Sequence, residues 1–542
     1  MKFKPRYALL STCLLAAVPA QASDKTDFAD CDGLEQPGKQ EDGMRGAASA
    51  LPYAGASTPA MTIGACSRAL ASPRLLPTQK LRQANLLRAR AAAFLQSSNP
   101  VAALKDLDAA SAVTAAQAND PFFARSMGVS LSLLRSIALA QAGDLPTAVL
   151  WSQKAAAARP YSLQVQQVAA MIGQLGRSTT TRTLSPWAPI TRLDPTAAST
   201  VVLKEAELGD FASVLALQAN AVPNWPSERL DPMALFANGP AANNLLSTML
   251  VQLAVAYARA ATGDPMGARR DLAQVQARVA ALRPVAAPGA ANPFTARADA
   301  VLDAFLATHV RQIEARIAVD ENRPSDALAA LIAAPLPHDA ATVELLRALK
   351  TAVPAKDAAL VPDPASFEPD RADGRRKVLA AIAPAALIAP ETPRAVIDYK
   401  SARPNILGAM VSGAFSMGFS LLGGIKRTDG FHSTSNPDGS IRVEFVGNTP
   451  SAPLVQEMTL LRAAEMTREA HKPAFVIVAR KDYTRKLTTT QRGMVIKSVT
   501  TGFKTELTIR YVDANERSAR AIDALTVIDA LGPLYYTAPP AA

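Results

Sequence analysis

The chain has 542 residues, enough for more than one domain, and 49% of them are hydrophobic although only 5% are aromatic. Alanine is abundant in every helical region, which predicts closely packed helices rather than a core of large side chains. The formal net charge of +11 permits an anionic partner and does not determine a fold. The sequence contains no glycine-rich phosphate loop and no His-Glu-x-x-His motif, which argues against nucleotide-binding and zinc-protease families.

Residues 1–22 have the pattern of a signal peptide. Three basic residues precede an apolar segment at 8–18, and a small-x-small cleavage site ends at Ala22. A lipoprotein signal ending at Cys13 is the alternative, but Thr12 fits poorly before a modified cysteine and the preceding apolar segment is short. We therefore predict export to the periplasm.

Residues 23–80 form an N-terminal segment with the two cysteines that remain after cleavage. Cys31 and Cys66 have no histidine cluster nearby, and an exported protein folds in an oxidising compartment, which favours a disulfide over a metal site. The bridge would tie an irregular segment to the first helix, which begins near Ala65. Two unpaired thiols are the alternative.

Residues 81–350 repeat one local pattern, which is clearest at 136–160. Two helices flank a Gly143-Asp144 break, because glycine adopts the left-handed conformation at a helix end and aspartate caps the next helix. The small side chains of Ala148 and Ala155 allow the two helices to cross closely. Related breaks predict further helical hairpins, with turns at 97–100, 209–210, 263–265 and 322–324.

The spacing of these positions resembles that of tetratricopeptide repeats. The residues that carry the resemblance are Ala103, Leu107 and Ala110 in one unit and Leu139, Gly143, Ala148, Ala155 and Pro160 in the next. The resemblance implies an α-solenoid, in which helix pairs stack into a curved binding surface. Insertions at 177–196 and 222–244 interrupt the register, so an irregular helical array without true repeats is the alternative.

Residues 351–404 are rich in proline and read as a linker. Eight prolines lie between positions 354 and 404, and a cluster of basic residues surrounds Arg375. We predict a single short helix at 375–382 within this linker and a domain boundary here.

Residues 405–426 form an apolar, glycine-rich segment. No charged residue lies between Ile406 and Ile425, and the length of this run is sufficient to cross a bilayer. Its glycines weaken a helix and its serines lower its hydrophobicity. The sequence is therefore compatible with a membrane span and with a buried or interfacial apolar segment.

Residues 427–537 have the pattern of a small α+β domain. Alternating hydrophobicity at 440–446 predicts a half-buried strand. The other predicted elements are an amphipathic helix at 454–470, strands at 475–478, 494–499 and 506–512, and a closing helix at 517–531. The whole chain is thus predicted to be mostly α, with a tetratricopeptide-like α-solenoid followed by this domain.

The C-terminal domain is similar to a family of small bacterial envelope lipoproteins of unknown function. The segments that carry the similarity are RVEFVGN, LLRAAEMTREAHKPAFVIV and VIDALGP, and it extends over about 429–536. Family members begin with a lipoprotein signal, whereas this chain has Ile425 where the lipidated cysteine would stand. Lipidation is therefore not implied, and the family brings no established catalytic residues.

The sequence offers no clear catalytic, cofactor or metal site. The four histidines are scattered, and His432 near Asp429 and Asp438 is the best catalytic candidate, with a solvated turn histidine as the ordinary explanation. A basic stretch suits lipid phosphate, anionic polysaccharide or an acidic protein, and a solvated strand face is its alternative. Its members are Arg480, Lys481, Arg485, Lys486, Arg492, Lys497 and Lys504. A nucleic-acid partner is disfavoured, because the protein is predicted to be exported to the periplasm.

We therefore expect an exported cell-envelope scaffold or adaptor that binds protein or peptide partners and needs no cofactor. Two alternatives are an enzyme with an unrecognised site in the C-terminal domain and a membrane-anchored sensor that spans at 406–425. A deep pocket with convergent His, Asp or Ser side chains would favour the enzyme. A long open groove would favour the scaffold.

Overall fold

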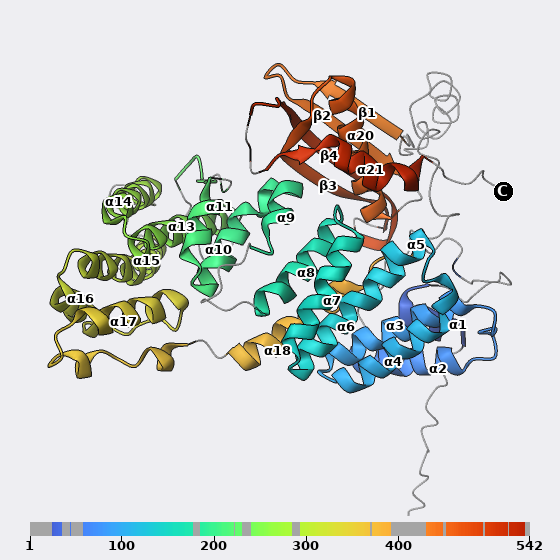
Figure 1. The fold of residues 1–542 in the computed structure, drawn as a ribbon, viewed down its shortest axis with the longest axis horizontal. Helices are drawn as coiled ribbons and strands as arrows, with labels where there is room; N and C mark the ends of the chain where they lie inside the picture. Colours follow the sequence, from blue (N-terminus) through green and yellow to red (C-terminus); the bar gives the residue numbers. More distant parts are fainter. Residues whose placement is uncertain are drawn as a thin grey trace, which may run out of the picture.

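The computed structural model is mostly helical and carries a small antiparallel sheet at its C-terminal end (Figure 1). This confirms the predicted order of a mostly α region followed by a small α+β domain. The predicted signal peptide at 1–22 and the apolar segment at 405–426 lie outside the described residues. The structure describes residues 24–34, 44, 58–176, 185–219, 221, 223–229, 240–283, 293–368, 371–391, 430–447, 451–491, 494–516, 518 and 520–536.

The first helical body contains the N-terminal helices and one helix from much later in the chain. Its cluster of buried apolar residues extends from α3 to α8 and continues into α18 and the turn after it. Its helices are α1 (Asp24–Asp32), α2 (Pro59–Ala71), α3 (Lys80–Gln96), α4 (Pro100–Val113), α5 (Pro121–Phe123), the π-helix η3 (Ala124–Gly128), α6 (Val129–Ala142), α7 (Leu145–Ala158), α8 (Leu163–Leu175) and α18 (Arg371–Ile382).

The predicted helical hairpin at 136–160 is present as α6 and α7. Gly143 has a φ of 94°, and the Asp144 side chain accepts a hydrogen bond from the Thr147 backbone N–H at 3.2 Å. The Ala148 side chain is fully buried, and the Ser136 hydroxyl donates to its carbonyl oxygen at 2.5 Å. A larger side chain at position 136 or 148 would therefore push α6 and α7 apart.

The predicted disulfide joins Cys31 of α1 to Cys66 of α2. Asp32, next to it, accepts hydrogen bonds from Arg82 at 3.1 Å and from Asn85 at 2.7 Å, both on α3. The bridge and these contacts together attach α1 to the rest of the body.

The segment that the sequence treats as irregular thus contains the short helix α1, in which Cys31 lies. The helix predicted to begin near Ala65 is α2 and begins earlier, at Pro59, with Thr58 as its N-cap.

The second helical body is a separate packing unit with its own core. Its turns repeat the hairpin pattern, with left-handed backbone at Gly209, Gly263 and Asn322. Its first and last helices contact each other, so the body closes on itself instead of leaving a wide concave face. Its helices are α10 (Ala198–Leu208), α11 (Phe211–Gln218), α13 (Pro240–Ala261), α14 (Pro265–Leu282), α15 (Pro293–Asp320), α16 (Pro324–Ile332) and α17 (Ala340–Ala352), and α9 (Ala188–Leu193) precedes them.

The structure gives the predicted linker a different role over residues 371–391. Helix α18 packs against α3 and α6 and buries Leu379 and Ile382, and Arg88 donates to the Ile388 carbonyl oxygen at 2.7 Å. Apolar side chains between the prolines explain this packing, which the proline count alone did not reveal. The second body is therefore an insertion into the first, between α8 and α18 (Figure 1).

The sheet domain, residues 430–536, is a five-stranded antiparallel sheet in the order β1-β2-β4-β3-β5, with α20 against one face. Two predicted strands at 494–499 and 506–512 are one continuous strand, β4. The closing helix begins at Ala524 rather than at 517, because Asp523 caps it through the Thr526 N–H at 2.7 Å. The elements are β1 (Gly430–Ser435), β2 (Ile441–Gly447), α20 (Ala452–Glu469), β3 (Ala474–Gln491), β4 (Met494–Val512), β5 (Ile522–Asp523) and α21 (Ala524–Tyr535).

Candidate functional site

A buried charge cluster fixes the sheet domain to the first helical body. Arg159, at the end of α7, places its Nε 2.9 Å from Oε1 of Glu457 on α20, and Arg125 of η3 pairs with Oε2. Glu391, after α18, lies 2.6 Å from Nη2 of Arg159. The Tyr535 hydroxyl of α21 donates to Glu457 at 2.8 Å. We call these five residues the interdomain charge cluster.

The charges in this cluster balance, with two cations and two anions. Burial raises the pKa of Glu457, but the guanidinium groups of Arg125 and Arg159 outweigh this effect and hold the pKa at about 2. Burial also raises the pKa of Tyr535 well above its usual range, so the phenol keeps its proton and donates it to the cluster. All five side chains are buried. The cluster therefore joins the two domains and is closed to a substrate.

A groove on the first helical body lies between α4 and α7, which both pack against α6. Its volume is about 560 Å³, which is in the range of ligand-binding sites. Its floor is apolar, and Ala155 and Ala158 of α7 leave room above it. We call it the Trp151 groove, and its main lining residues are Phe123, Val129, Leu131, Arg135, Trp151 and Lys154.

Two cations flank the indole of Trp151 in this groove. The Arg135 guanidinium carbon lies 5.3 Å from the ring centroid, and Lys154 Nζ lies 4.9 Å from it. Asp108 pairs with Arg135 at 2.5 Å, and Lys154 is exposed. Tryptophan and arginine are the side chains that most often dominate protein-binding surfaces. Asp108 compensates the charge of Arg135, so Lys154 is the main cation at the rim of the groove among the described residues. An apolar floor beside this cation suits a polypeptide segment with an apolar side chain next to acidic ones.

A second cavity, of about 440 Å³, lies between the two helical bodies. Residues of α8 and α18 line one side, and residues of α10 and the start of α17 line the other. A smaller cavity of about 230 Å³ inside the second body shares Glu207, Asp339 and Ala340 with it. None of the residues lining either cavity is a serine, threonine or cysteine. The smaller cavity does contain the Tyr257 hydroxyl, which donates to the Ala341 carbonyl oxygen and to Glu344, both at 2.6 Å. Burial raises the pKa of Tyr257 well above its usual range, so this phenol keeps its proton.

No two histidines line the same described cavity. His338 lines the cavity between the bodies, and His309 lines the smaller one and contacts the Phe305 carbonyl oxygen through Nδ1 at 3.0 Å. His432 lies on β1 opposite Glu444 and is exposed, while Asp429 lies outside the described residues. Among the described residues, no group of three or more His, Cys, Asp or Glu side chains is arranged to hold a metal ion.

The predicted basic stretch is divided by the structure. Arg480 pairs with Asp482 at 2.7 Å and donates to the Leu193 carbonyl oxygen, which makes it part of the contact with α9. Lys504 pairs with Glu444 at 3.0 Å and with Glu506, so its charge is neutralised within the sheet. Lys481, Arg485 and Lys486 lie on β3, and the side chains of Arg492 and Lys497 are outside the described part of the chain.

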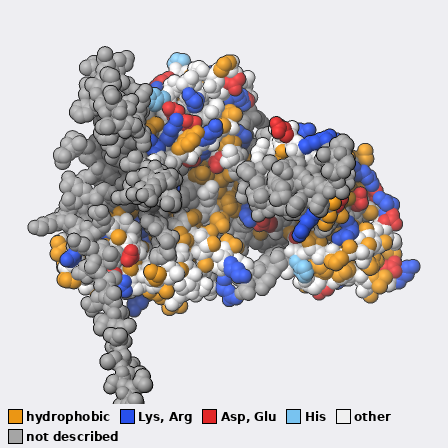
Figure 2. Space-filling view, turned by 180° about the vertical axis from the view of Figure 1, so that it is seen from behind, with side chains coloured by type: hydrophobic (Ala, Val, Ile, Leu, Met, Phe, Trp, Pro, Cys, Tyr) orange, Lys and Arg blue, Asp and Glu red, His pale blue; other side chains and the backbone are white. Residues whose placement is uncertain are grey.

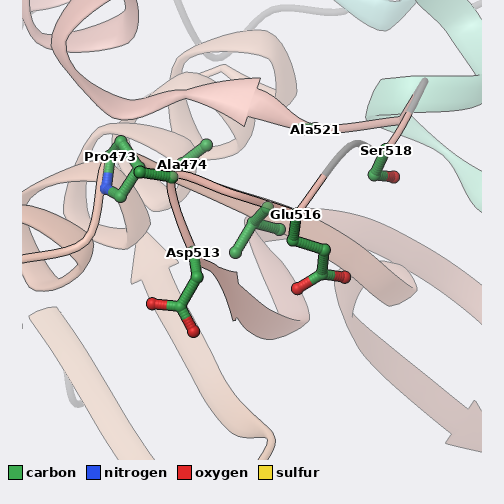
Figure 3. Close-up of a pocket in the computed structure, with 8 residues that line it drawn as sticks. Pro473, Ala474, Asp513, Glu516, Ser518 and Ala521 are labelled. Carbon is green, nitrogen blue, oxygen red and sulfur yellow. The ribbon is translucent and has the colours of Figure 1, made fainter.

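A shallow pocket at the end of the sheet contains two acidic residues (Figure 3). The carboxylates of Asp513 and Glu516 extend from the segment after β4, and Ser518 lies on the far side of the pocket. Lys472 pairs with Asp513, and Arg510 pairs with Glu516 at 2.8 Å. Both acids thus already have partners, which leaves the pocket without a free charged group to bind a ligand.

The surface view from behind shows acidic and basic side chains interspersed, with apolar atoms exposed between them (Figure 2). Among the described residues visible on this face, charges of one sign do not form an extended patch. Within the described residues, one helical stretch, Pro121–Ala142, has the length and composition of a membrane span, and 72% of its most apolar part is buried in the protein. Its buried apolar side chains form part of the core of the first helical body.

Comparisons with known proteins identify no relative. No family model, no curated protein and no solved structure matches the chain. The geometry of the molecule is therefore the basis for its proposed function.

Proposed function

We propose that this protein is an exported scaffold or adaptor of the cell envelope, which holds a polypeptide partner in the Trp151 groove. The observation that carries the proposal is the position of Trp151 between Arg135 and Lys154 above an apolar floor. A half-buried indole can insert between partner side chains with little loss of entropy. The cationic rim selects a partner segment whose apolar residue is flanked by Asp or Glu.

The helical hairpins support an architecture related to tetratricopeptide repeats. In each of the hairpins at α6–α7, α10–α11 and α13–α14, a glycine with positive φ precedes an aspartate that caps the second helix. Stacked hairpins of this kind build grooves between successive second helices, as α4 and α7 do here. We infer that the groove uses this architecture to bind a partner.

The interdomain charge cluster favours the scaffold over a transmembrane sensor. Arg125 and Arg159 of the first helical body contact Glu457 and Tyr535 of the sheet domain directly. Two domains in such contact occupy the same compartment. A segment at 406–425 that entered a membrane would then have to leave it on the side where it entered.

We expect a photo-crosslinking amino acid at Ser111, which is exposed and lines the groove, to form a discrete adduct with one partner in intact cells. Trp151→Ala should reduce the yield of this adduct at least tenfold, because the loss of a central anchor costs about 2 kcal/mol or more of binding energy. Mass spectrometry of the adduct identifies the bound segment. The synthetic segment should bind the purified chain and lose affinity to the same extent in the variant.

The matched control is the same crosslinker at Met266 on α14, which is 75% exposed and distant from the groove. The circular dichroism melt of Trp151→Ala should stay close to that of the parent chain, because the indole is half-buried at the surface. An adduct that forms equally from Met266, or that persists undiminished in the Trp151→Ala chain, would contradict the proposed groove.

A further inference from the structure

We propose that the cavity between the two helical bodies binds a small organic anion with an apolar body, such as a medium-chain carboxylate. The inference goes beyond the proposed adaptor function, because this cavity and the Trp151 groove share no residue. We call the cavity the interbody cleft. The residues on which the argument rests are Met171, Leu175, Trp187, Lys204 and Arg375.

The interbody cleft is a built site rather than a gap between loosely placed domains. Its volume of about 440 Å³ is typical of pockets for small molecules, which often lie at domain interfaces. Gln174 of the first body donates to the Lys204 carbonyl oxygen of the second at 2.8 Å. The Gln174 side-chain oxygen accepts from Trp187 Nε1 at 2.8 Å, which fixes the indole at the wall. The walls are therefore held in place before a ligand arrives.

The apolar part of the ligand follows from the walls. Met171 and Leu175 come from α8, and Trp187 precedes α9. Val378 of α18 is 40% exposed and faces the same cavity. Apolar surface from three separate segments meets here, so a ligand with a hydrocarbon or aromatic body would remove it from water.

The charge of the ligand follows from which cleft groups are already paired. Lys204 Nζ lies 2.7 Å from Glu207, so these two charges compensate each other. The Asp339 carboxylate caps α17 through the Thr342 N–H at 2.7 Å and accepts from Gln312 at 3.1 Å. No ion pair or hydrogen bond links the half-buried Arg375 guanidinium to another described residue.

Among the described residues that line the interbody cleft, Arg375 is thus the cation without an ion-pair partner, whereas the Asp339 carboxylate is held at the start of α17. Lys377 on the same helix adds to the positive potential. A planar guanidinium binds a carboxylate through two parallel hydrogen bonds, which ammonium or imidazole groups do not form. The geometry therefore places the acid group of the ligand at Arg375 and its apolar body against Met171 and Leu175.

The test uses the full mature chain with Trp187 as its own reporter. Replacing Trp151 and Trp225 by phenylalanine leaves Trp187 as the remaining tryptophan. Titration with sodium decanoate should change the fluorescence of this chain in a saturable way and raise its melting temperature. Decanol and decyltrimethylammonium should bind at least tenfold more weakly, because they have the same apolar body without the anionic group.

Arg375→Gln should weaken decanoate binding about tenfold, as expected for the loss of a charge-assisted hydrogen-bonded pair. Lys377→Gln is the matched control, because it removes one charge from the same helix at an exposed position outside the cleft lining. It should change the affinity less than twofold. Both variants should melt like the parent chain in the absence of decanoate.

Three results would overturn the inference. These are equal binding of decanol and decanoate, tighter binding of decyltrimethylammonium, and no fluorescence change with any of the three. Unchanged decanoate affinity in Arg375→Gln would remove the assigned position of the acid group. Because the reporter lies in the interbody cleft, the adduct at Ser111 and its dependence on Trp151 remain a separate test of the adaptor.

Discussion

Glu457→Gln should destabilise the whole chain by about 3–5 kcal/mol. The substitution keeps the volume of the side chain but leaves Arg125 and Arg159 facing a single carboxylate, that of Glu391, in a site with no access to water. An uncompensated buried charge costs far more than the loss of an exposed ion pair. Denaturant unfolding followed by circular dichroism measures the change in the free energy of unfolding.

The control is Asp513→Asn, which removes an exposed ion pair with Lys472 from the same domain. It should change stability by less than about 1 kcal/mol. If the two variants unfolded at the same denaturant concentration, the interdomain charge cluster would not be what holds the sheet domain in place.

Acid provides a second measurement on the same cluster. The pKa of Glu457 in the folded protein is about 2, below its ordinary value of 4.5. A depressed pKa contributes stability that is fully present above pH 4.5 and is lost as the pH falls through 2. Stability should therefore decrease over this window in the parent chain. The decrease should be smaller in Glu457→Gln, which has no carboxylate to titrate at this position.

Cys66→Ser should cost about 3–4 kcal/mol, because the disulfide closes a loop of 35 residues in the unfolded chain. Without the bridge, α1 is attached through the contacts of Asp32 with Arg82 and Asn85. The parent chain in the presence of a reductant should unfold at the same denaturant concentration as the variant. Two alkylatable thiols in the purified, unreduced protein would show that the bridge does not form.

The parts of the fold that are set by neighbouring residues could be predicted from the sequence. The turn at Gly143 and Asp144 is such a case, because a left-handed glycine and a capping carboxylate act within one helical turn. The amphipathic helix at 454–470 is another, since its apolar spacing is local. The disulfide followed from export and from the number of cysteines that remain after cleavage.

The functional geometry depends on contacts between distant segments and could not be predicted in this way. Glu457 is the one charged residue among the buried residues of α20, and that was the one local signal of the interdomain charge cluster. Its partner Arg159 is 298 positions away. No periodicity links such residues, and the basic stretch gave no sign that Lys504 pairs with Glu444 of the neighbouring strand β2.

In the proline-rich segment, the packing against the first helical body was not predicted from the sequence. The sequence predicts a linker with one short helix at 375–382, and this helix is present as α18. The apolar residues between Leu379 and Ile388 are, however, buried against the first helical body. Proline at position 384 begins a short turn and does not prevent this packing. Strand β1 was missed because its sequence, GFHSTS, lacks the alternation of large apolar residues that identifies β2.

The central claim is that both helical bodies and the sheet domain lie together on the exported side of the membrane. The most direct measurement is the labelling of single cysteines in the full chain with a membrane-impermeant maleimide, in intact cells whose outer envelope is permeabilised. Ala157→Cys reports on the first helical body and Leu525→Cys on the sheet domain, and both positions are exposed. Cys31 and Cys66 are bridged and do not react.

Both variants should label to the same extent before lysis. Labelling of Ala157→Cys before lysis together with labelling of Leu525→Cys only after lysis would establish a membrane span between the domains. That result would contradict the shared compartment which the contact between Arg159 and Glu457 requires. Protection of both positions until lysis would contradict export itself.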